Sequence, residues 1–452
     1  SGQAVCQRLE ELTKEERECG LLARVELSRS LEFLLRGQDF GPGKNRTLAD
    51  WAKELQSSLE LEKRFDPVRS ANCARCPYRV PVDSLSPGQL SGFEECWGQA
   101  ERRKENKCDI PVLDVWNTRK KGEWISEGKL FLNDIPEDFR ILPAPSDAPM
   151  EKPERQALQI AMTLDDSPGR VLRRGLADEM SNWVFPLHFI DFETLSAPLP
   201  LFGGMRPYEP IAFQYSHHIV HEDGRVEHAG EFLQQEGFPN FELVRNLRTH
   251  LSEDTGTIFR YHNHENTILR AVRHQLLQRG RTVPDGQELI AFIDQITHPT
   301  KNEGDIGAGV RDMVDMHRLV REYWYEPSMG GSISIKAVLP AAMKGSDFLR
   351  AEYSKPVYGA TPGIPSLNFT NQVWWRQEDG EVLDPYQLLD PVFSGLSDGD
   401  RRYLSALDGG EGGDVVHQGG TAMMAYAELQ WPTTPKERKE EIRRQLKRYC
   451  EL

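Results

Sequence analysis

An Asp-x-Glu pair at the end of an apolar run has the clearest potential for chemistry in this sequence. Asp191 and Glu193 follow apolar residues that begin at Val184. Because side chains alternate along a strand, a strand here places both carboxylates on one face. Neighbouring carboxylates repel each other unless a cation neutralises them, and oxygen-rich sites suit Mg²⁺ or Mn²⁺. The spacing predicts such a metal site, and the alternative is an exposed strand end with two solvated acids.

Two later segments offer residues that would complete a metal site. Residues 257–261 predict a short strand, and Glu265 follows at the start of an amphipathic helix. Near the end of the sequence, Tyr449 lies on a helix predicted to begin after Thr434-Pro435. Taken alone, Tyr449 would be an aromatic residue on a helix face. A pair of divalent ions at such a site can activate water and stabilise the leaving oxygen in phosphodiester hydrolysis.

These segments resemble, in order, the motifs of the DEDD superfamily of 3′→5′ exonucleases. Asp191-Phe192-Glu193 matches the first motif, and Glu265 stands in the second motif where the superfamily usually has Asp. The third motif is a helical Tyr-x-x-x-Asp. Tyr449 is in place, and the sequence ends at Leu452, one residue before the Asp with which we expect the natural chain to continue. The resemblance implies that Asp191, Glu193 and Glu265 bind the metal ions and that Tyr449 positions the attacking water.

A finer resemblance covers about residues 93–452. It is to an uncharacterised bacterial family of DEDD-type proteins, often joined to an N-terminal RecB-like nuclease region. The stretches that carry it are 189–194, 206–208, 213–216, 331–340, 419–423 and 449–452. The resemblance implies a ribonuclease-H-like α/β domain with a mixed sheet. Arg206 and Lys336 lie in two of these stretches and are candidates for phosphate contacts, and a plain surface role is the alternative for each.

Cysteines gather in the N-terminal region, where six of the seven lie in the first 108 residues. Cys73-Ala-Arg-Cys76 is a chelating pair, and Cys96 and Cys108 follow it. Four thiolates would hold Zn²⁺ or an iron–sulfur cluster, and the alternative is a set of ordinary reduced cysteines in helices. Residues 1–110 contain no Glu-x-Lys on a predicted strand, so a RecB-like nuclease site is expected to be absent or degraded here.

The elements that must position these residues divide the chain into three expected parts. Residues 1–140 predict a mainly helical region with the cysteine cluster, and the proline-interrupted residues 141–182 predict a linker. Over residues 183–452, short strands followed by alternating helices favour an α/β domain. Strands are expected at 211–220, 227–233 and 257–261, and helices at 241–251, 265–278, 422–429 and 436–452.

Composition limits the classes of function. The 452 residues carry 55 Lys and Arg against 70 Asp and Glu, a formal net charge of −15. This balance argues against a protein that coats nucleic acid by bulk charge, but a local basic groove remains compatible with it. One candidate for such a basic surface is the C-terminal helix, with Arg443, Arg444, Lys447 and Arg448. No apolar run is long enough for a transmembrane helix and no secretory signal is seen, so we expect a cytoplasmic protein without a membrane partner.

The sequence therefore predicts a metal-dependent 3′→5′ exonuclease that acts on DNA or RNA in bacterial nucleic-acid processing or defence. Two alternatives stay open. One is a catalytically incomplete module that keeps the nuclease fold and binds nucleic acid or a protein partner, which Glu265 and the missing fourth acid favour. The other is a metal-dependent endonuclease that uses the same acids.

Overall fold

The chain forms two compact units in the computed structural model. One unit comprises residues 1–70 and 95–98, and the other comprises residues 71–94 and 99–452. The predicted domain boundaries after residues 140 and 182 stay predictions. No helix of the described part is long and apolar enough to span a membrane. The structure describes residues 27–36, 47–63, 68–79, 89–97, 110–142, 146–165, 169–234, 236–279, 282–301, 303–304, 307–378, 381–389 and 419–452.

The smaller unit contains the described helices α3 (Ser28–Arg36) and α4 (Leu48–Glu60). Helix α4 begins at a capping box, in which the Thr47 hydroxyl accepts a hydrogen bond from the Asp50 backbone N–H at 3.1 Å. The Asp50 carboxylate in turn accepts one from the Thr47 N–H at 3.2 Å. This reciprocal pair satisfies two of the backbone groups that a helix start leaves unpaired.

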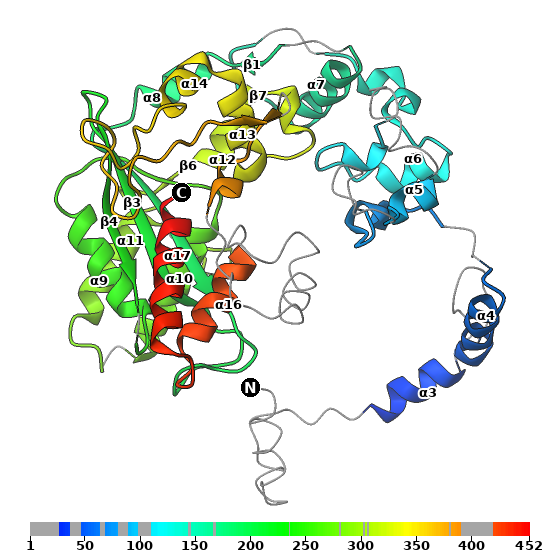
Figure 1. Cartoon of the computed structure of the whole chain (residues 1–452), viewed down its shortest axis with the longest axis horizontal. Coiled ribbons are helices and arrows are strands. Elements are labelled where there is room, and N and C mark those ends of the chain that lie inside the picture. Colours follow the sequence, from blue (N-terminus) through cyan, green and yellow to red (C-terminus); the bar gives the residue numbers. More distant parts are fainter. Residues whose placement is uncertain are drawn as a thin grey trace, which may run out of the picture. The chain divides into compact units, whose positions relative to one another are not determined.

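A five-stranded mixed sheet lies at the centre of the larger unit (Figure 1). Its central strand β2 pairs in antiparallel fashion with β3, which pairs in the same way with β4. On its other side, β2 runs parallel to β5, and β5 runs parallel to β6. The expected mixed α/β architecture is therefore confirmed. The strands are β2 (Leu187–Leu195), β3 (Ile211–Val220), β4 (Val226–Leu233), β5 (Ile258–Arg260) and β6 (Val314–Asp315).

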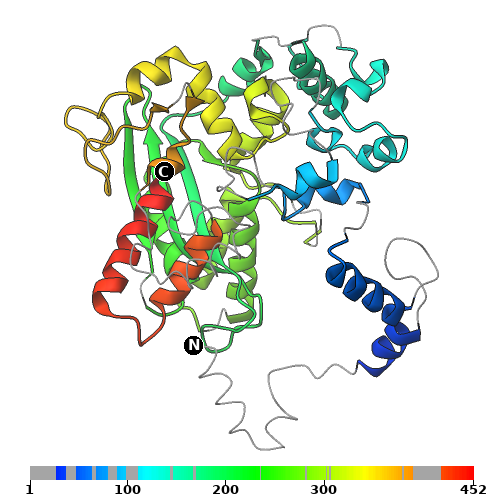
Figure 2. The same cartoon turned by 45° about the vertical axis from the view of Figure 1, so that its right-hand side comes forward.

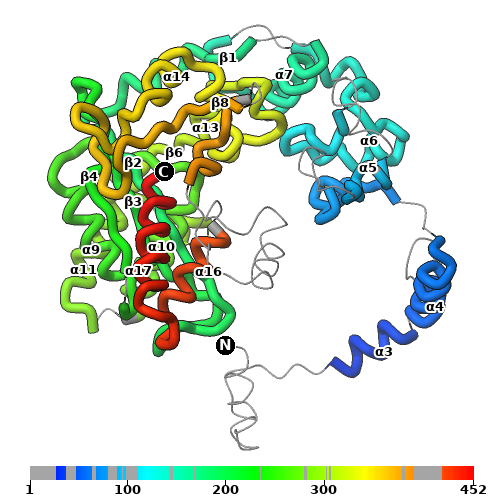
Figure 3. The backbone as a smooth tube through the Cα atoms, viewed as in Figure 1, coloured from blue at the N-terminus to red at the C-terminus, as the bar shows by residue number. Residues whose placement is uncertain are grey.

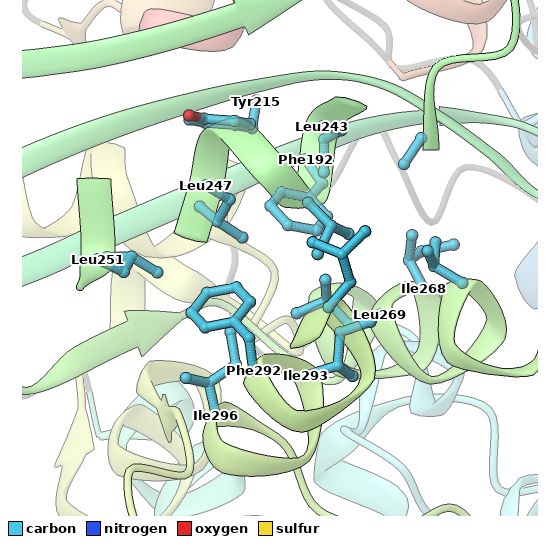
Figure 4. Close-up of a cluster of buried hydrophobic side chains, with 14 of the residues drawn as sticks. Phe192, Tyr215, Leu243, Leu247, Leu251, Ile268, Leu269, Phe292, Ile293 and Ile296 are labelled. Carbon is cyan, nitrogen blue, oxygen red and sulfur yellow. The ribbon is translucent and has the colours of Figure 1, made fainter. Parts of the chain in front are cut away.

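Helices cover both faces of this sheet. On one face, α9 (Asn240–Leu251), α10 (His264–Arg279) and α11 (Gly286–Ile296) enclose a core of buried aliphatic and aromatic side chains, drawn in Figure 4. On the other face, α16 (Gly419–Leu429) and α17 (Lys436–Glu451) lie side by side against β2 and β3 (Figure 2). The helices predicted at 241–251, 265–278, 422–429 and 436–452 are all confirmed, with ends that differ by up to three residues.

The alternation of side chains along β2 decides which residues meet which core. Ile190 and Phe192 point into the core beneath α9, α10 and α11. Leu195 belongs to the opposite core, which α16 and α17 cover. Because Asp191 and Glu193 alternate with the first pair, they face the side of the C-terminal helices. The period of two therefore directs both acids away from the main apolar core.

The segment expected as a linker is partly helical. Its helix α7 (Lys152–Leu164) carries the buried Arg155, which donates hydrogen bonds to the carbonyls of Val320, Arg321 and Trp324 at 3.2, 3.2 and 2.7 Å. All three bonds come from the Nη1 atom, and they fix one end of this buried guanidinium against the chain around residue 320. Strand β1 (Val171–Leu172) also pairs with β7 (Trp324–Tyr325). Helix α7 and strand β1 thus pack against the chain around residues 320–325.

Shorter elements complete the larger unit, and their course can be followed along the tube in Figure 3. They are η1 (Ala71–Arg75), α5 (Gly92–Trp97), whose last three residues are counted in the smaller unit, η4 (Val112–Asp114), α6 (Lys121–Ser126), η5 (Leu132–Asp134), η6 (Glu137–Phe139), α8 (Gly175–Met180), α12 (Met316–Tyr323), η7 (Pro327–Met329), α13 (Ile335–Gly345), α14 (Asp347–Tyr353), β8 (Gln377–Glu378), β9 (Glu381–Val382) and η8 (Pro385–Leu388).

Candidate active site

The structure brings Asp191, Glu193 and Glu265 together, and we refer to these three residues as the carboxylate cluster. Asp191 and Glu193 come from the middle of β2, and Glu265 comes from the first turn of α10, just after the parallel neighbour β5. Burial raises the pKa of both the Asp191 and the Glu265 carboxyl, and the backbone N–H of Phe192 opposes the rise in each, which places these two groups beside one amide. The two carboxylates on β2 and the carboxylate at the start of α10 thus lie at one site.

Burial and mutual repulsion make the cluster electrostatically unfavourable in its ionised form. The Glu193 side chain is buried, and burial, with repulsion by Asp191 and Glu265, raises its pKa well above the usual value. The pKa of Glu265 is raised in the same direction by burial and by Asp191. Asp191 keeps an exposed side chain, yet the protein atoms crowded around it raise its pKa to about 7. A cation would relieve this repulsion.

The donor set fits a hard divalent cation such as Mg²⁺ or Mn²⁺. Carboxylate oxygens are the ligands that these ions prefer. Glu265 is only 2% exposed, and its Oε2 atom has no hydrogen-bond partner among the described residues. A buried carboxylate oxygen without a partner is costly unless something binds it. The three carboxylates do not form a group whose ligand atoms all lie within 4.8 Å, so one ion bound by all three would require the side chains to move.

Helix α17 brings Tyr449 to the carboxylate cluster. Tyr449 is buried, and burial together with the charges of Glu193 and Asp191 raises the pKa of its phenol well above the usual value. The next residue, Cys450, is also buried, and its thiol donates to the Asp191 backbone carbonyl at 3.7 Å. The last turns of α17 therefore lie directly over the middle of β2.

Two residues near the cluster were not predicted, namely Tyr386 in η8 and Cys450. Burial, followed by the charges of Asp191 and Glu193, raises the pKa of Tyr386, whose ring centroid lies 5.9 Å from that of Tyr449. Tyr386 lies in an irregular stretch without hydrophobic periodicity, so no pattern pointed to it. The Asp384-Pro385 pair is a typical helix start, and it is the one local signal of η8.

The two cations predicted to contact phosphate have different positions. Lys336, in the first turn of α13, lies close enough to Glu193 to lower the pKa of that carboxyl, and its Nζ atom lies 5.4 Å from the ring centroid of Tyr386. Arg206 is exposed on the loop between β2 and β3, and no described contact joins it to the carboxylates. The structure thus brings Lys336 to the candidate site and leaves Arg206 outside it.

Three of the four cations predicted to form a basic surface on the C-terminal helix have contacts within the larger unit, and the basic surface itself stays a prediction. Lys447 forms an ion pair with Glu231, and Arg444 pairs with Glu441 at 2.8 Å. The Arg448 guanidinium lies 4.5 Å from the ring centroid of Phe369. The Lys447–Glu231 pair joins α17 to β4, whereas the Arg444–Glu441 pair lies within α17.

The cysteine site predicted from Cys73, Cys76, Cys96 and Cys108 stays a prediction. Cys73 and Cys76 belong to the larger unit, where the Cys76 N–H donates to the Cys73 carbonyl at 3.3 Å. Cys96 belongs to the smaller unit, and Cys108 lies outside the described residues. The Zn²⁺ or iron–sulfur interpretation and that of ordinary reduced cysteines therefore both stay open.

A second polar group, formed by His218, His228 and Glu451, fixes the end of α17. Their ligand atoms all lie within 4.8 Å of one another, close enough for a metal ion. Burial would raise the pKa of Glu451, but hydrogen bonds from His228 and other groups hold it below its usual value. The carboxylate accepts from His228 at 3.0 Å, Tyr358 at 2.9 Å, Asn368 at 2.8 Å and also Ser366. These partners satisfy the Glu451 carboxylate, whereas the buried His228 Nε2 atom has no hydrogen-bond partner among the described residues.

Comparison with known protein families gives a match over residues 188–334. The matching family is described as a domain of unknown function (DUF2779). The match begins on β2 and ends just before α13, so it contains the whole carboxylate cluster but not Tyr449. No curated protein and no solved structure matches the chain.

Proposed function

We propose that this protein is a metal-dependent 3′→5′ exonuclease that hydrolyses phosphodiester bonds in DNA or RNA. The observation that carries the proposal is the convergence of Asp191, Glu193 and the buried Glu265 on one site, where a carboxylate oxygen of Glu265 has no partner in the part of the chain that the structure describes. The resemblance of these residues to the DEDD motifs supports the proposal. Position 265 departs from the superfamily by one methylene group, and a longer carboxylate still provides metal-binding oxygens.

The strand order supports a ribonuclease-H-like fold for the same domain. Three antiparallel strands are followed in the sheet by two parallel ones, in the order β4-β3-β2-β5-β6. This order puts the first strand of the domain at the centre of the sheet and beside the parallel strand that leads into α10. A residue on the central strand and a residue at the start of that helix can therefore share one site.

The proposed chemistry assigns separate roles to the residues around the cluster. Bound Mg²⁺ or Mn²⁺, held by Asp191, Glu193 and Glu265, would supply the charge that activates water and stabilises the leaving oxygen. Because the raised pKa keeps the Tyr449 phenol protonated at neutral pH, this group can donate a hydrogen bond that orients the attacking water. Lys336 supplies a positive charge beside the carboxylates, where the scissile phosphate would lie.

The test is digestion of 5′-labelled single-stranded DNA and RNA with Mg²⁺ or Mn²⁺. We expect a ladder that shortens from the 3′ end, and a loss of at least about 100-fold in rate for Asp191→Asn and for Glu193→Gln, since each removes a ligand charge while keeping the side-chain shape. Asp178→Asn is the matched control, because Asp178 is an exposed acid on α8.

Two results would replace this proposal. Cleavage of circular single-stranded DNA would indicate an endonuclease, since an exonuclease needs a free end. A folded protein that binds nucleic acid but hydrolyses none with either ion would indicate a non-catalytic binding module.

A further inference from the structure

We propose that a single strand of nucleic acid lies in a groove formed by two connected pockets beside the carboxylate cluster, where Trp116 stacks on a base and Arg75 and Lys121 bind the phosphates that follow. The proposal deepens the proposed function, because it names the form of the substrate and the residues that hold it. It concerns residues outside the DEDD-like motifs, and it can fail independently of the hydrolytic chemistry.

At two points, the residues that line the inner pocket lie close in sequence to residues in or beside the carboxylate cluster. Its volume is about 410 Å³, and its lining includes Trp116, Tyr261, His262, His317 and residues 331–335. His262 lies three residues before Glu265, at the junction of β5 and α10. At the other point, the lining ends one residue before Lys336, whose charge acts on Glu193. A strand that reaches the carboxylates through this pocket therefore passes its aromatic wall.

The aromatic wall of the inner pocket is fixed by its own contacts. The ring of His317 packs edge-on against Tyr261 and His262, with centroid distances of 5.8 and 4.6 Å. The Tyr261 hydroxyl donates to the Ile333 carbonyl at 2.7 Å. His262 has a φ of +68°. Residues other than glycine rarely adopt a positive φ angle, and those that do cluster at binding and catalytic sites. Aromatic faces of this kind stack on unpaired bases.

The outer pocket continues from the inner one and carries a local positive charge. Its volume is about 750 Å³, and the two pockets share Trp116, Gly331 and Ser332 in their linings. The charged lining residues are Arg75, Arg79, Lys121 and Asp114, which gives 3 − 1 = +2. Burial and the nearby cations Arg79 and Arg75 lower the pKa of Lys121, so these charges lie close together. In a chain with a net charge of −15, this is a local site for phosphate.

The ion pairs of the three cations in the outer pocket indicate which of these cations can bind a phosphate. Both terminal nitrogens of Arg79 donate hydrogen bonds to the carboxylate oxygens of Asp114, each at 2.9 Å. These bonds fix the segment that carries Arg79 to the segment that carries Asp114. Within the described part of the chain, neither Arg75 nor Lys121 has an ion-pair partner, and Arg75 is exposed. We therefore assign phosphate binding to Arg75 and Lys121 rather than to Arg79.

The groove is preformed where its two pockets meet. The side chain of Gln159 accepts a hydrogen bond from the Trp116 backbone N–H at 2.7 Å and donates a hydrogen bond to the Asp114 backbone carbonyl at 2.8 Å. Gly331 lies so close that a Cβ atom there would be 2.0 Å from the Asp114 oxygen. The indole of Trp116 also has the guanidinium of Arg155 over its ring, at 5.6 Å. These contacts hold Trp116 in place before a ligand arrives, which lowers the entropic cost of binding.

The combination of aromatic and cationic groups favours a single strand over a duplex. Base faces are hidden in a duplex, so a stacking wall has a ligand only when the bases are unpaired. A pocket of about 410 Å³ admits one or a few bases and not a double helix. An acidic peptide would match the cations but would leave Trp116, Tyr261 and the histidines without a stacking partner.

The experiment measures binding of 5′-fluorescein-labelled oligo(dT) and oligo(rU) to the full chain by fluorescence anisotropy in EDTA, where hydrolysis is not required. We expect Trp116→Leu, which keeps an apolar side chain, to weaken binding about tenfold, as is typical for loss of one stacked base. The double variant Arg75→Glu with Lys121→Glu should weaken it further and flatten the dependence of affinity on salt. A duplex of equal length should bind at least about tenfold more weakly.

Lys120→Glu is the matched control for Lys121→Glu measured on its own, because it makes the same charge change one residue away from Lys121. Lys120 lies over the ring of Phe139 at 4.4 Å and lines a different pocket. Equal weakening by Lys120→Glu, equal affinity for duplex, or equal competition by poly-glutamate would overturn the groove proposal. Comparing oligo(dT) with oligo(rU) identifies the preferred nucleic acid.

The two proposals separate cleanly in these measurements. Binding that depends on Trp116, Arg75 and Lys121, without hydrolysis under Mg²⁺ or Mn²⁺, would remove the exonuclease and keep the groove. Hydrolysis and binding that are both unchanged in the groove variants would remove the groove and keep the exonuclease. Thermal melts of each variant show whether a loss of binding reflects a loss of fold, and the surface charge reversals keep the test independent of the Trp116 substitution.

Discussion

At the level of single residues, the ionised carboxylates of the carboxylate cluster repel one another in the folded protein. Glu193 and Glu265 are buried, and each has its pKa raised by burial and by neighbouring carboxylates. Lys336 and Arg260 oppose this effect but do not reverse it, since both carboxyl pKa values remain above their usual range. A protein keeps such an arrangement at a cost to its stability, and functional sites are where that cost is commonly found.

This repulsion predicts a dependence of stability on pH in the absence of metal. Because these carboxyls bind protons more tightly when folded than when unfolded, the folded state is favoured at low pH and loses stability as the pH rises through the folded pKa values. The pKa of about 7 for Asp191 extends this loss to neutral pH. In EDTA we expect the Tm to fall between about pH 5 and pH 8, where each kcal/mol corresponds to roughly 2–4 °C.

Added Mn²⁺ should restore the Tm, and more so at pH 8 than at pH 5, because protons compete with the ion. Differential scanning calorimetry measures both effects. Glu193→Gln should flatten the pH dependence, since it removes one of the interacting charges. Two results would contradict repulsion within the carboxylate cluster as the cause. One is a Tm that does not depend on pH over this range, and the other is an increase in Tm on adding Mn²⁺ that is equal in Glu193→Gln and in the unmodified protein.

At the level of elements, the sequence predicted the strands and helices that carry the cluster because their patterns are regular. The strand predicted at 211–220 coincides with β3, and the apolar spacing of residues 265–278 predicted α10 to within a residue. Tyr386 lies in a 3₁₀ turn without such a pattern, and only tertiary packing brings it to the site. Neither could spacing show that Lys447 would be paired with Glu231, since this contact joins residues far apart in the chain. Local periodicity defines elements, whereas the partners of a surface charge depend on tertiary structure.

The end of α17 supplies a prediction at this level. Glu451 is buried and accepts hydrogen bonds from His228, Tyr358, Asn368 and Ser366, which join α17 to β4 and to residues 358–368. Glu451→Gln replaces an acceptor oxygen with a donor and removes a charge that these groups surround. We expect the free energy of unfolding to fall by about 2–4 kcal/mol, because the remaining polar groups stay buried.

Urea denaturation followed by circular dichroism measures this loss. Glu440→Gln is the control on the same helix, because Glu440 is exposed and pairs only loosely with Lys436 at 3.8 Å. We expect Glu440→Gln to change the free energy of unfolding by no more than about 0.5 kcal/mol. Similar small effects for both variants would show that the buried network does not stabilise the position of α17.

At the level of the whole larger unit, the candidate site depends on segments that are distant in sequence. The carboxylates come from β2 and α10, and Tyr449 comes from the C-terminal helix. The proposed groove adds residues 74–79 and 110–121, which meet the chain around residues 327–335 at the two pockets. Hydrolysis and substrate binding are thereby assigned to separate parts of one unit, and the part that binds substrate contains a junction between Gly331 and Asp114.

That junction gives the last prediction, which concerns the close approach of Gly331 to Asp114. An alanine Cβ at position 331 would lie 2.0 Å from the Asp114 carbonyl oxygen and 3.0 Å from the Gln159 side chain, so the two backbones must separate. We expect Gly331→Ala to lower the free energy of unfolding by about 1–3 kcal/mol, as overpacking does elsewhere. Because the same shift displaces Trp116, binding of oligo(dT) should weaken while hydrolysis of a dinucleotide, which needs little of the groove, is retained. Gly203→Ala is the control, since no atom lies within 4 Å of its added Cβ. Urea denaturation and anisotropy on the two variants test the prediction, and equal stability and affinity in both would show that this contact does not hold the groove together.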